Sequence, residues 1–84
     1  MTPLRRYFKL PTFETGHGAK GWWYVEFEGE WATRQIEVFP NKILTSARDG
    51  YLCDLPLKDT SLLEIPGAEI TQEEFLAIWA TYAG

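Results

Sequence analysis

Cysteine and histidine are almost absent from this sequence, which has one of each in 84 residues. The single cysteine, Cys53, excludes an intramolecular disulfide. No hydrophobic leader follows Met1, and a chain with neither a leader nor disulfides is typical of the cytoplasm. We therefore expect a cytoplasmic protein.

Long apolar runs and an excess of basic residues are missing as well. No run approaches the roughly 18 apolar residues of a membrane-spanning helix, so no membrane contact is expected. Lys and Arg number 8 against 12 Asp and Glu, which gives a net charge of −4. This charge opposes binding to the phosphates of nucleic acids over most of the molecule. Nucleic acid is therefore not an expected partner.

Sequence motifs of known catalytic and cofactor sites are absent too. The chain has no Gly-x-Gly-x-x-Gly, no phosphate-binding loop, no Cys-x-x-Cys and no nucleophile elbow. His17 lies in a glycine-rich segment without a second metal ligand or a catalytic partner. Glu26, Glu28 and Glu30 recur at strand spacing, which is typical of a solvated sheet face. We expect no enzyme activity, no cofactor and no metal.

The clearest local signal is a helix start near the C-terminus. Thr71 is placed to accept a hydrogen bond from the backbone N–H of Glu74, and the Glu74 side chain to reach back to the Thr71 N–H. Ile70, outside the helix, would pack on Phe75 inside it. The helix is predicted over 72–82, and its apolar stripe consists of Phe75, Ile78, Trp79 and Tyr82.

Aromatic residues and strand-like alternation dominate the sequence before that helix. Trp, Tyr and Phe make up 15% of the chain, and each buries roughly 150–250 Å² in a core. A chain of this length has room for a single domain, 1–84. Strands are predicted at 7–10, 22–28, 31–38 and 43–48, with a fifth at 51–55. The expected fold class is α+β, an antiparallel β-meander of four to five strands with one C-terminal helix packed on one face.

Turn residues separate these strands. Pro11 is expected to end the first strand and to open a flexible loop over 11–21. Gly29-Glu30 predicts a type II′ turn, and Asp49-Gly50 predicts the hairpin that leads to the fifth strand. Pro40-Asn41-Lys42 is a further turn. The segment 57–67 is expected to wrap the sheet irregularly.

The hairpin at Gly29-Glu30 predicts two faces of the sheet. One face would contact the helix through Trp23, Val25, Phe27, Ile36 and Val38. Arg34 shares this face, and its long stem would reach the sheet rim. The opposite face is expected to be exposed, and it carries Trp22, Tyr24, Glu26, Glu28, Trp31, Gln35 and Glu37.

These seven residues are the candidate partner-binding surface. Protein interfaces concentrate aromatic residues ringed by polar groups. The predicted function is a non-enzymatic cytoplasmic protein-binding or accessory module whose acidic surface meets a basic protein partner. The alternative is a small peptide- or ligand-binding domain that uses the aromatic and acidic sheet face. Coverage of this face by 11–21 or 57–67 is also open, and the oligomeric state is not indicated.

Three segments together resemble a known family. They are Arg6-Tyr7-Phe8-Lys9, the run 34–39 before a turn, and Glu64-Ile65 followed by 70–75 with Trp79 in the helix. This pattern resembles a family of small uncharacterised bacterial proteins, a domain of unknown function. The family usually has Asp-Gly where this chain has Pro40-Asn41-Lys42. The resemblance implies a sheet with a C-terminal helix and assigns no activity, so no functional residue is carried over.

Overall fold

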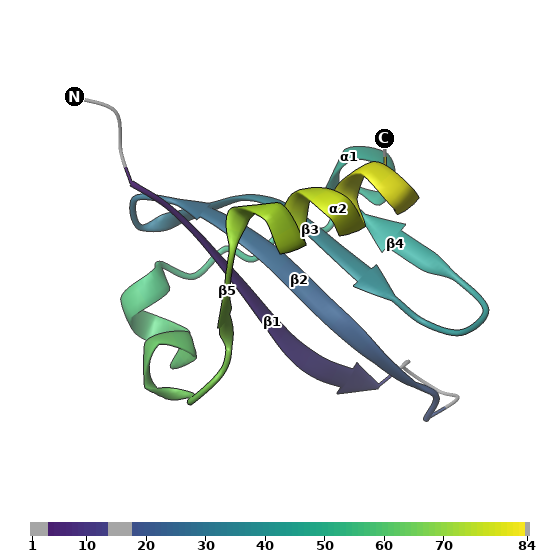
Figure 1. Cartoon of the computed structure of the whole chain (residues 1–84), viewed down its shortest axis with the longest axis horizontal. Helices are drawn as coiled ribbons and strands as arrows, with labels where there is room; N and C mark the ends of the chain where they lie inside the picture. Colours follow the sequence, from purple (N-terminus) through teal and green to yellow (C-terminus); the bar gives the residue numbers. More distant parts are fainter. Residues whose placement is uncertain (1–3, 14–17, 84) are drawn as a thin grey trace.

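A computed structural model describes residues 4–13 and 18–83 as a five-stranded antiparallel sheet with one long helix (Figure 1). The order of strands across the sheet is β4-β3-β2-β1-β5. The strands are β1 (Arg5–Phe13), β2 (Lys20–Glu28), β3 (Trp31–Val38), β4 (Ile43–Thr45) and β5 (Glu69–Ile70). The helices are α1 (Ser46–Asp49), the 3₁₀ turns η1 (Leu57–Asp59) and η2 (Leu62–Glu64), and α2 (Gln72–Tyr82). The predicted α+β class is confirmed.

A different segment covers each face of the sheet. Helix α2 packs Phe75, Ile78 and Trp79 on one face, against a cluster that includes Tyr7, Tyr24, Ile36 and Val38. Leu57 and Leu62 of the 3₁₀ turns pack on the opposite face, against Phe8, Val25 and Phe27. Irregular wrapping by the segment 57–67 is thus confirmed. The expectation of one wet sheet face is wrong, because both faces carry core residues.

A β-bulge at Thr33 explains why the predicted faces are wrong. The pairs Glu28 with Trp31 and Phe27 with Ala32 follow the predicted register, but Glu26 then pairs with Arg34 and leaves Thr33 without a partner. The extra residue reverses the alternation of everything after it. Ile36 and Val38 therefore lie under α2 as predicted, whereas Trp23, Val25 and Phe27 lie on the other side of the sheet.

The fifth strand lies elsewhere than the hairpin signal predicts. The chain leaves β4 after Thr45, whose hydroxyl accepts a hydrogen bond from the Arg48 N–H (3.0 Å) and so caps helix α1. Gly50 has a φ of 78° and ends that helix instead of forming a hairpin. No strand forms over 51–55 in the described chain. The fifth strand is β5, which pairs with Tyr7 and Phe8 of β1.

Strand β1 extends through Pro11 to Phe13, so the predicted strand end at Pro11 is wrong. The Lys9 N–H donates to the Ala68 carbonyl (2.8 Å), away from β2. By alternation the Pro11 nitrogen also points away from β2. The missing N–H of Pro11 therefore removes no hydrogen bond between β1 and β2. This is why proline is tolerated at this position of the strand.

The predicted turns and the helix start agree with the structure in most details. Gly29 has a φ of 66°, and residues 39–42 turn between β3 and β4. Thr71 Oγ1 accepts from the Glu74 N–H (3.1 Å) at the start of α2. The Glu74 carboxylate, however, contacts Lys9 Nζ at 3.0 Å. Half of the predicted reciprocal cap is therefore present, and the other half is replaced by an ion pair with β1.

Candidate functional site

The seven residues of the candidate partner-binding surface do not share one face. Trp22, Tyr24 and Glu26 point to the α2 side of the sheet, as do Glu28 and Trp31 near the β2–β3 turn. Beyond the bulge, Gln35 and Glu37 are paired with Val25 and Trp23 and point to the opposite side. The prediction that all seven residues lie on one exposed face of the sheet is therefore wrong.

Burial divides the same residues further. Tyr24 and Glu26 are buried beneath α2, and Gln35 is buried on the other face. Trp22 is 38% exposed and Trp31 is 55% exposed. The two exposed tryptophans thus lie at opposite ends of the β2–β3 hairpin, and their contact with a partner stays a prediction.

Glu26 has a structural role beneath the helix. Its carboxylate accepts from Arg34 Nε (2.9 Å) and Nη2 (2.7 Å), and from Thr33 Oγ1 (2.7 Å). The Arg34 guanidinium carbon lies 5.3 and 5.1 Å from the ring centroids of Phe75 and Trp79, so it also stacks under α2. Burial raises the pKa of Glu26, but the donors from Arg34 and Thr33 outweigh it and bring this pKa to about 2. Glu26 is therefore an ionised structural carboxylate and not an acid–base group.

Tyr7 completes this buried layer. Its hydroxyl is buried and has no hydrogen-bond partner among the described residues. Burial raises the pKa of Tyr7, and the charge of Glu26 raises it further. The α2 side of the sheet centre is closed by packed side chains and offers a partner no access.

A groove opens on the opposite side of the sheet. It has a volume of about 450 Å³ and is lined by Thr12, Trp23, Gln35, Glu37, Tyr51, Leu52 and Cys53. The Gln35 side-chain oxygen accepts from the Cys53 N–H (2.8 Å), which holds the segment 51–53 beside β3. Tyr51 is 64% exposed and Leu52 is 41% exposed at its rim. We name this feature the Trp23 groove.

Of the seven residues that line the Trp23 groove, only Gln35 and Glu37 belong to the predicted surface, and the other five do not. Trp23 was expected in the core under the helix, and Tyr51 and Leu52 were expected in a strand. One signal was available, because consecutive residues of a strand point to opposite faces. The pair Trp22-Trp23 must therefore place one indole on each side of β2.

The described residues, 4–13 and 18–83, contain no metal-binding cluster and no membrane-spanning helix. No cluster of His, Cys, Asp and Glu there has the arrangement of a metal site. His17 lies outside the described residues. None of the described helices is long and apolar enough to cross a membrane.

Comparison with known proteins gives a consistent result. Residues 5–84 match the model of a family described as myosin VI cargo binding domain. The chain is 34% identical over 95 residues to unconventional myosin-VI of Sus scrofa and of Homo sapiens. It is 32% identical over 91 residues to myosin heavy chain 95F of Drosophila melanogaster. These alignments cover 100% of the chain but only 7 or 8% of each relative's length.

These matches overturn the resemblance to small bacterial proteins of unknown function, because the matching relatives are animal myosins. The segments that carried the resemblance are a strand, a strand before a turn and a capped helix. General rules of strand alternation and helix capping produce such segments in many families. The chain belongs to the myosin VI cargo binding domain family.

Proposed function

We propose that this chain is a non-enzymatic module that binds a protein cargo of a class VI myosin through the Trp23 groove. Membership of a cargo binding domain family supports the class of function. The observation that carries the location is a groove that contains Trp23 and Tyr51 and whose rim residues, Tyr51 and Leu52, are exposed. A cytoplasmic location fits this role, since Cys53 is a free thiol.

The composition of the Trp23 groove suits protein recognition. Tyr and Trp are common among the residues that contribute most to binding at interfaces. They bury a large area and lose little side-chain conformational entropy. Trp23 is half-buried on the core and is therefore held in place, while Tyr51 stands at the rim. Glu37 supplies a carboxylate to pair with a basic residue of the cargo. We expect a cargo segment that places an apolar side chain against Trp23.

Affinity capture with the purified domain tests this proposal. The wild-type protein and the variants Tyr51→Ala and Leu52→Ala are used as bait, and captured proteins are quantified by mass spectrometry. Both side chains are exposed, so the variants should fold normally. Loss of the same specific partners with both variants is expected.

The exposed Leu76 of α2 offers a matched control, because it is an apolar side chain on another part of the surface. Leu76→Ala should retain every partner. Trp31→Ala tests whether the start of β3, beside the β2–β3 turn, contributes as well. An unchanged partner set for Tyr51→Ala and Leu52→Ala would refute the location of the site.

A further inference from the structure

Glu37 is the charged residue in the lining of the Trp23 groove. Its side chain is half-buried, and it takes part in none of the ion pairs among the described residues, 4–13 and 18–83. A carboxylate in the wall of an aromatic groove, without a cation beside it, favours a positively charged ligand, because charge complementarity selects among partners.

Glu37 lies directly opposite Trp23 on the neighbouring strand. The Phe39 N–H donates to the Lys42 carbonyl (2.9 Å), so the backbone of Phe39 points toward the β4 side of β3. By alternation the backbone of Glu37 points the same way, and no hydrogen bonds join it to Trp23. Side chains approach each other most closely in such pairs. A ligand that reaches the indole is therefore within reach of the carboxylate.

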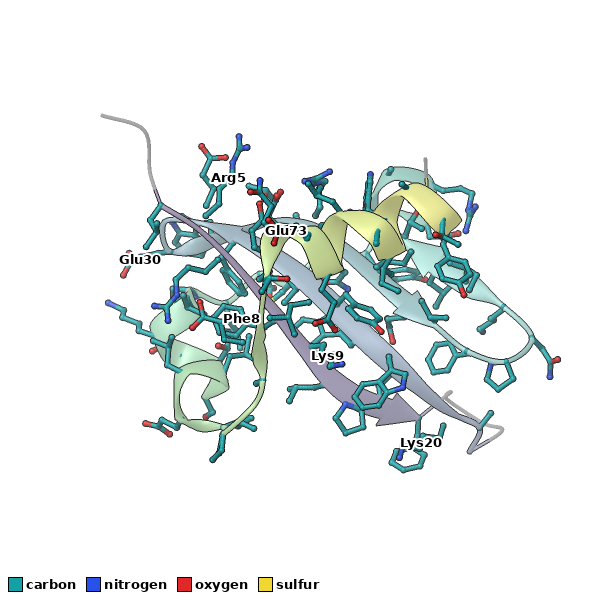
Figure 2. All side chains as sticks on the ribbon, in the orientation of Figure 1. Arg5, Phe8, Lys9, Lys20, Glu30 and Glu73 are labelled. Atoms are coloured by element: carbon teal, nitrogen blue, oxygen red, sulfur yellow. The ribbon has the colours of Figure 1, made fainter. Side chains whose placement is uncertain are left out.

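Two lysines at this end of the sheet face away from the groove. Lys9 of β1 and Lys20 of β2, both labelled in Figure 2, place their Nζ atoms 5.1 and 5.8 Å from the ring centroid of Trp22. Consecutive residues of a strand point to opposite faces, so the Trp22 ring lies on the α2 side and Trp23 on the other side. Neither lysine is therefore placed to neutralise Glu37.

The α2 side of the same sheet shows which cation suits an indole beside a carboxylate. There the Arg34 guanidinium donates two hydrogen bonds to Glu26 and lies 5.1 Å from the ring centroid of Trp79. A planar guanidinium makes both contacts at once, whereas the ammonium group of lysine is a compact point charge. The Trp23 groove has the indole and the carboxylate, but the described residues that line it include no arginine.

We infer that the Trp23 groove binds an arginine of the cargo, with its guanidinium stacked on Trp23 and paired with the Glu37 carboxylate. The inference rests on the proposed function and names the basic residue of the cargo that pairs with Glu37. The apolar side chain of the cargo comes from the second residue after the arginine, because residues two apart in an extended segment point to the same side. Leu52 at the rim is placed to contact it.

Titration with three synthetic peptides tests the inference. The peptide GRSLSG contains the arginine and the apolar residue, and its two analogues carry lysine or citrulline in place of the arginine. Citrulline has the planar shape of arginine without its charge. GRSLSG should shift the NMR signal of the Trp23 indole N–H with a dissociation constant of roughly 1 mM or below. Both analogues should bind about fivefold more weakly or worse.

Charge removal on the protein provides the matched control. Glu37→Gln keeps the shape of the side chain, and it should weaken binding of GRSLSG about fivefold to tenfold while leaving the citrulline peptide unchanged. Glu73→Gln changes the net charge equally. Glu73 lies in the first turn of α2, on the other side of the sheet (Figure 2), so this variant should bind all three peptides like wild type.

Failure of this inference is distinguishable from failure of the proposed function. In the affinity capture, Glu37→Gln as bait should lose the partners that Tyr51→Ala and Leu52→Ala lose. If Glu37→Gln alone retains them, the groove remains the binding site and recognition of arginine is refuted. If all three variants retain them, the proposed function itself is refuted.

Three results of the titration would overturn the inference. They are an unmoved Trp23 indole signal at roughly 10 mM GRSLSG, equal affinities of GRSLSG and its citrulline analogue for the wild type, and equal effects of Glu37→Gln and Glu73→Gln. Circular dichroism of each variant checks that the fold is retained.

Discussion

Glu26 and Arg34 form a bidentate ion pair between β2 and β3, with N–O distances of 2.9 and 2.7 Å. The pair exists because the bulge at Thr33 brings Arg34 opposite Glu26 and turns Arg34 toward α2, the side to which Glu26 points. Phe75 and Trp79 then cover the guanidinium. The same irregularity therefore sets the register of the sheet and the place where the helix docks.

Removing the charge of Glu26 should destabilise the protein strongly. Glu26→Gln leaves the half-buried Arg34 guanidinium beneath α2 without its counter-charge, which should cost about 2 kcal/mol or more. Glu28→Gln is the matched control, because Glu28 lies on the same face of β2 but contacts Arg5 only at 3.9 Å and near solvent. It should cost less than about 1 kcal/mol. Chemical denaturation measures both values, and equal losses would contradict this role of Glu26.

The Glu26 pair should also make stability depend on pH in the acid range. The pKa of Glu26 is lowered from 4.5 to about 2 in the folded protein. A lowered pKa stabilises the folded state above the unfolded-state value, and this stabilisation is lost as pH falls toward the folded-state value. The free energy of unfolding should therefore fall between about pH 5 and pH 2. Denaturation of Glu26→Gln over the same range should give a shallower fall, and parallel curves would assign the acid sensitivity to other groups.

The bulge is also the reason why the strands of the hairpin were predicted correctly, but not the face of the sheet on which their side chains lie. The limits of β3, the turn at Gly29-Glu30 and the helix start depend on nearby residues and were predicted correctly, whereas the ends of β1 and β4 were not. The bulge depends on Thr33, whose hydroxyl donates to the Glu26 carboxylate across the sheet (2.7 Å). Simple alternation in β3 contains no sign of it. One inserted residue then exchanges the faces of every residue beyond it.

The prediction of the fifth strand was wrong for a different reason, because Asp49-Gly50 fits two local structures. Asp49-Gly50 allows a positive φ, and a positive φ serves both a hairpin turn and the end of a helix. Thr45 decides between them, because its hydroxyl caps α1 and its N–H donates to Asp49 Oδ2 (2.8 Å). The pairing of β5 with β1 joins segments far apart in the sequence, and no local pattern predicts it. The Trp23 groove was missed because it depends on the bulge, which pairs Trp23 with Glu37, and on the path of residues 51–53 after α1.

The cap of α2 predicts a graded response at Thr71. Its hydroxyl accepts from the Glu74 N–H, so Thr71→Ala should lower the free energy of unfolding by about 0.5–2 kcal/mol. Thr71→Gly should lower it by only a few tenths of a kcal/mol through the loss of the cap. Thr81→Ala is the control in the same helix, because the Thr81 hydroxyl donates to the Ala77 carbonyl and supplies no cap. That change should be close to neutral, since alanine favours helix. A Thr71→Ala protein with the wild-type denaturation midpoint would place the helix start elsewhere.

Two glycines should respond in opposite ways to the same pair of substitutions. Gly50 has a φ of 78° with open space around its Cα, so its requirement is conformational. Asparagine tolerates the left-handed region better than alanine, and Gly50→Asn should therefore be more stable than Gly50→Ala, which costs roughly 1 kcal/mol. At Gly21 the requirement is space, because any Cβ meets the Val38 carbonyl and the Phe39 ring.

Gly21→Ala should cost about 1–3 kcal/mol by overpacking, and Gly21→Asn more. Thermal unfolding of the four variants gives the comparison. The asparagine variant should be the more stable one at position 50, and the alanine variant should be the more stable one at position 21. The same order at both glycines would mean that Phe39 does not pack across Gly21 as described.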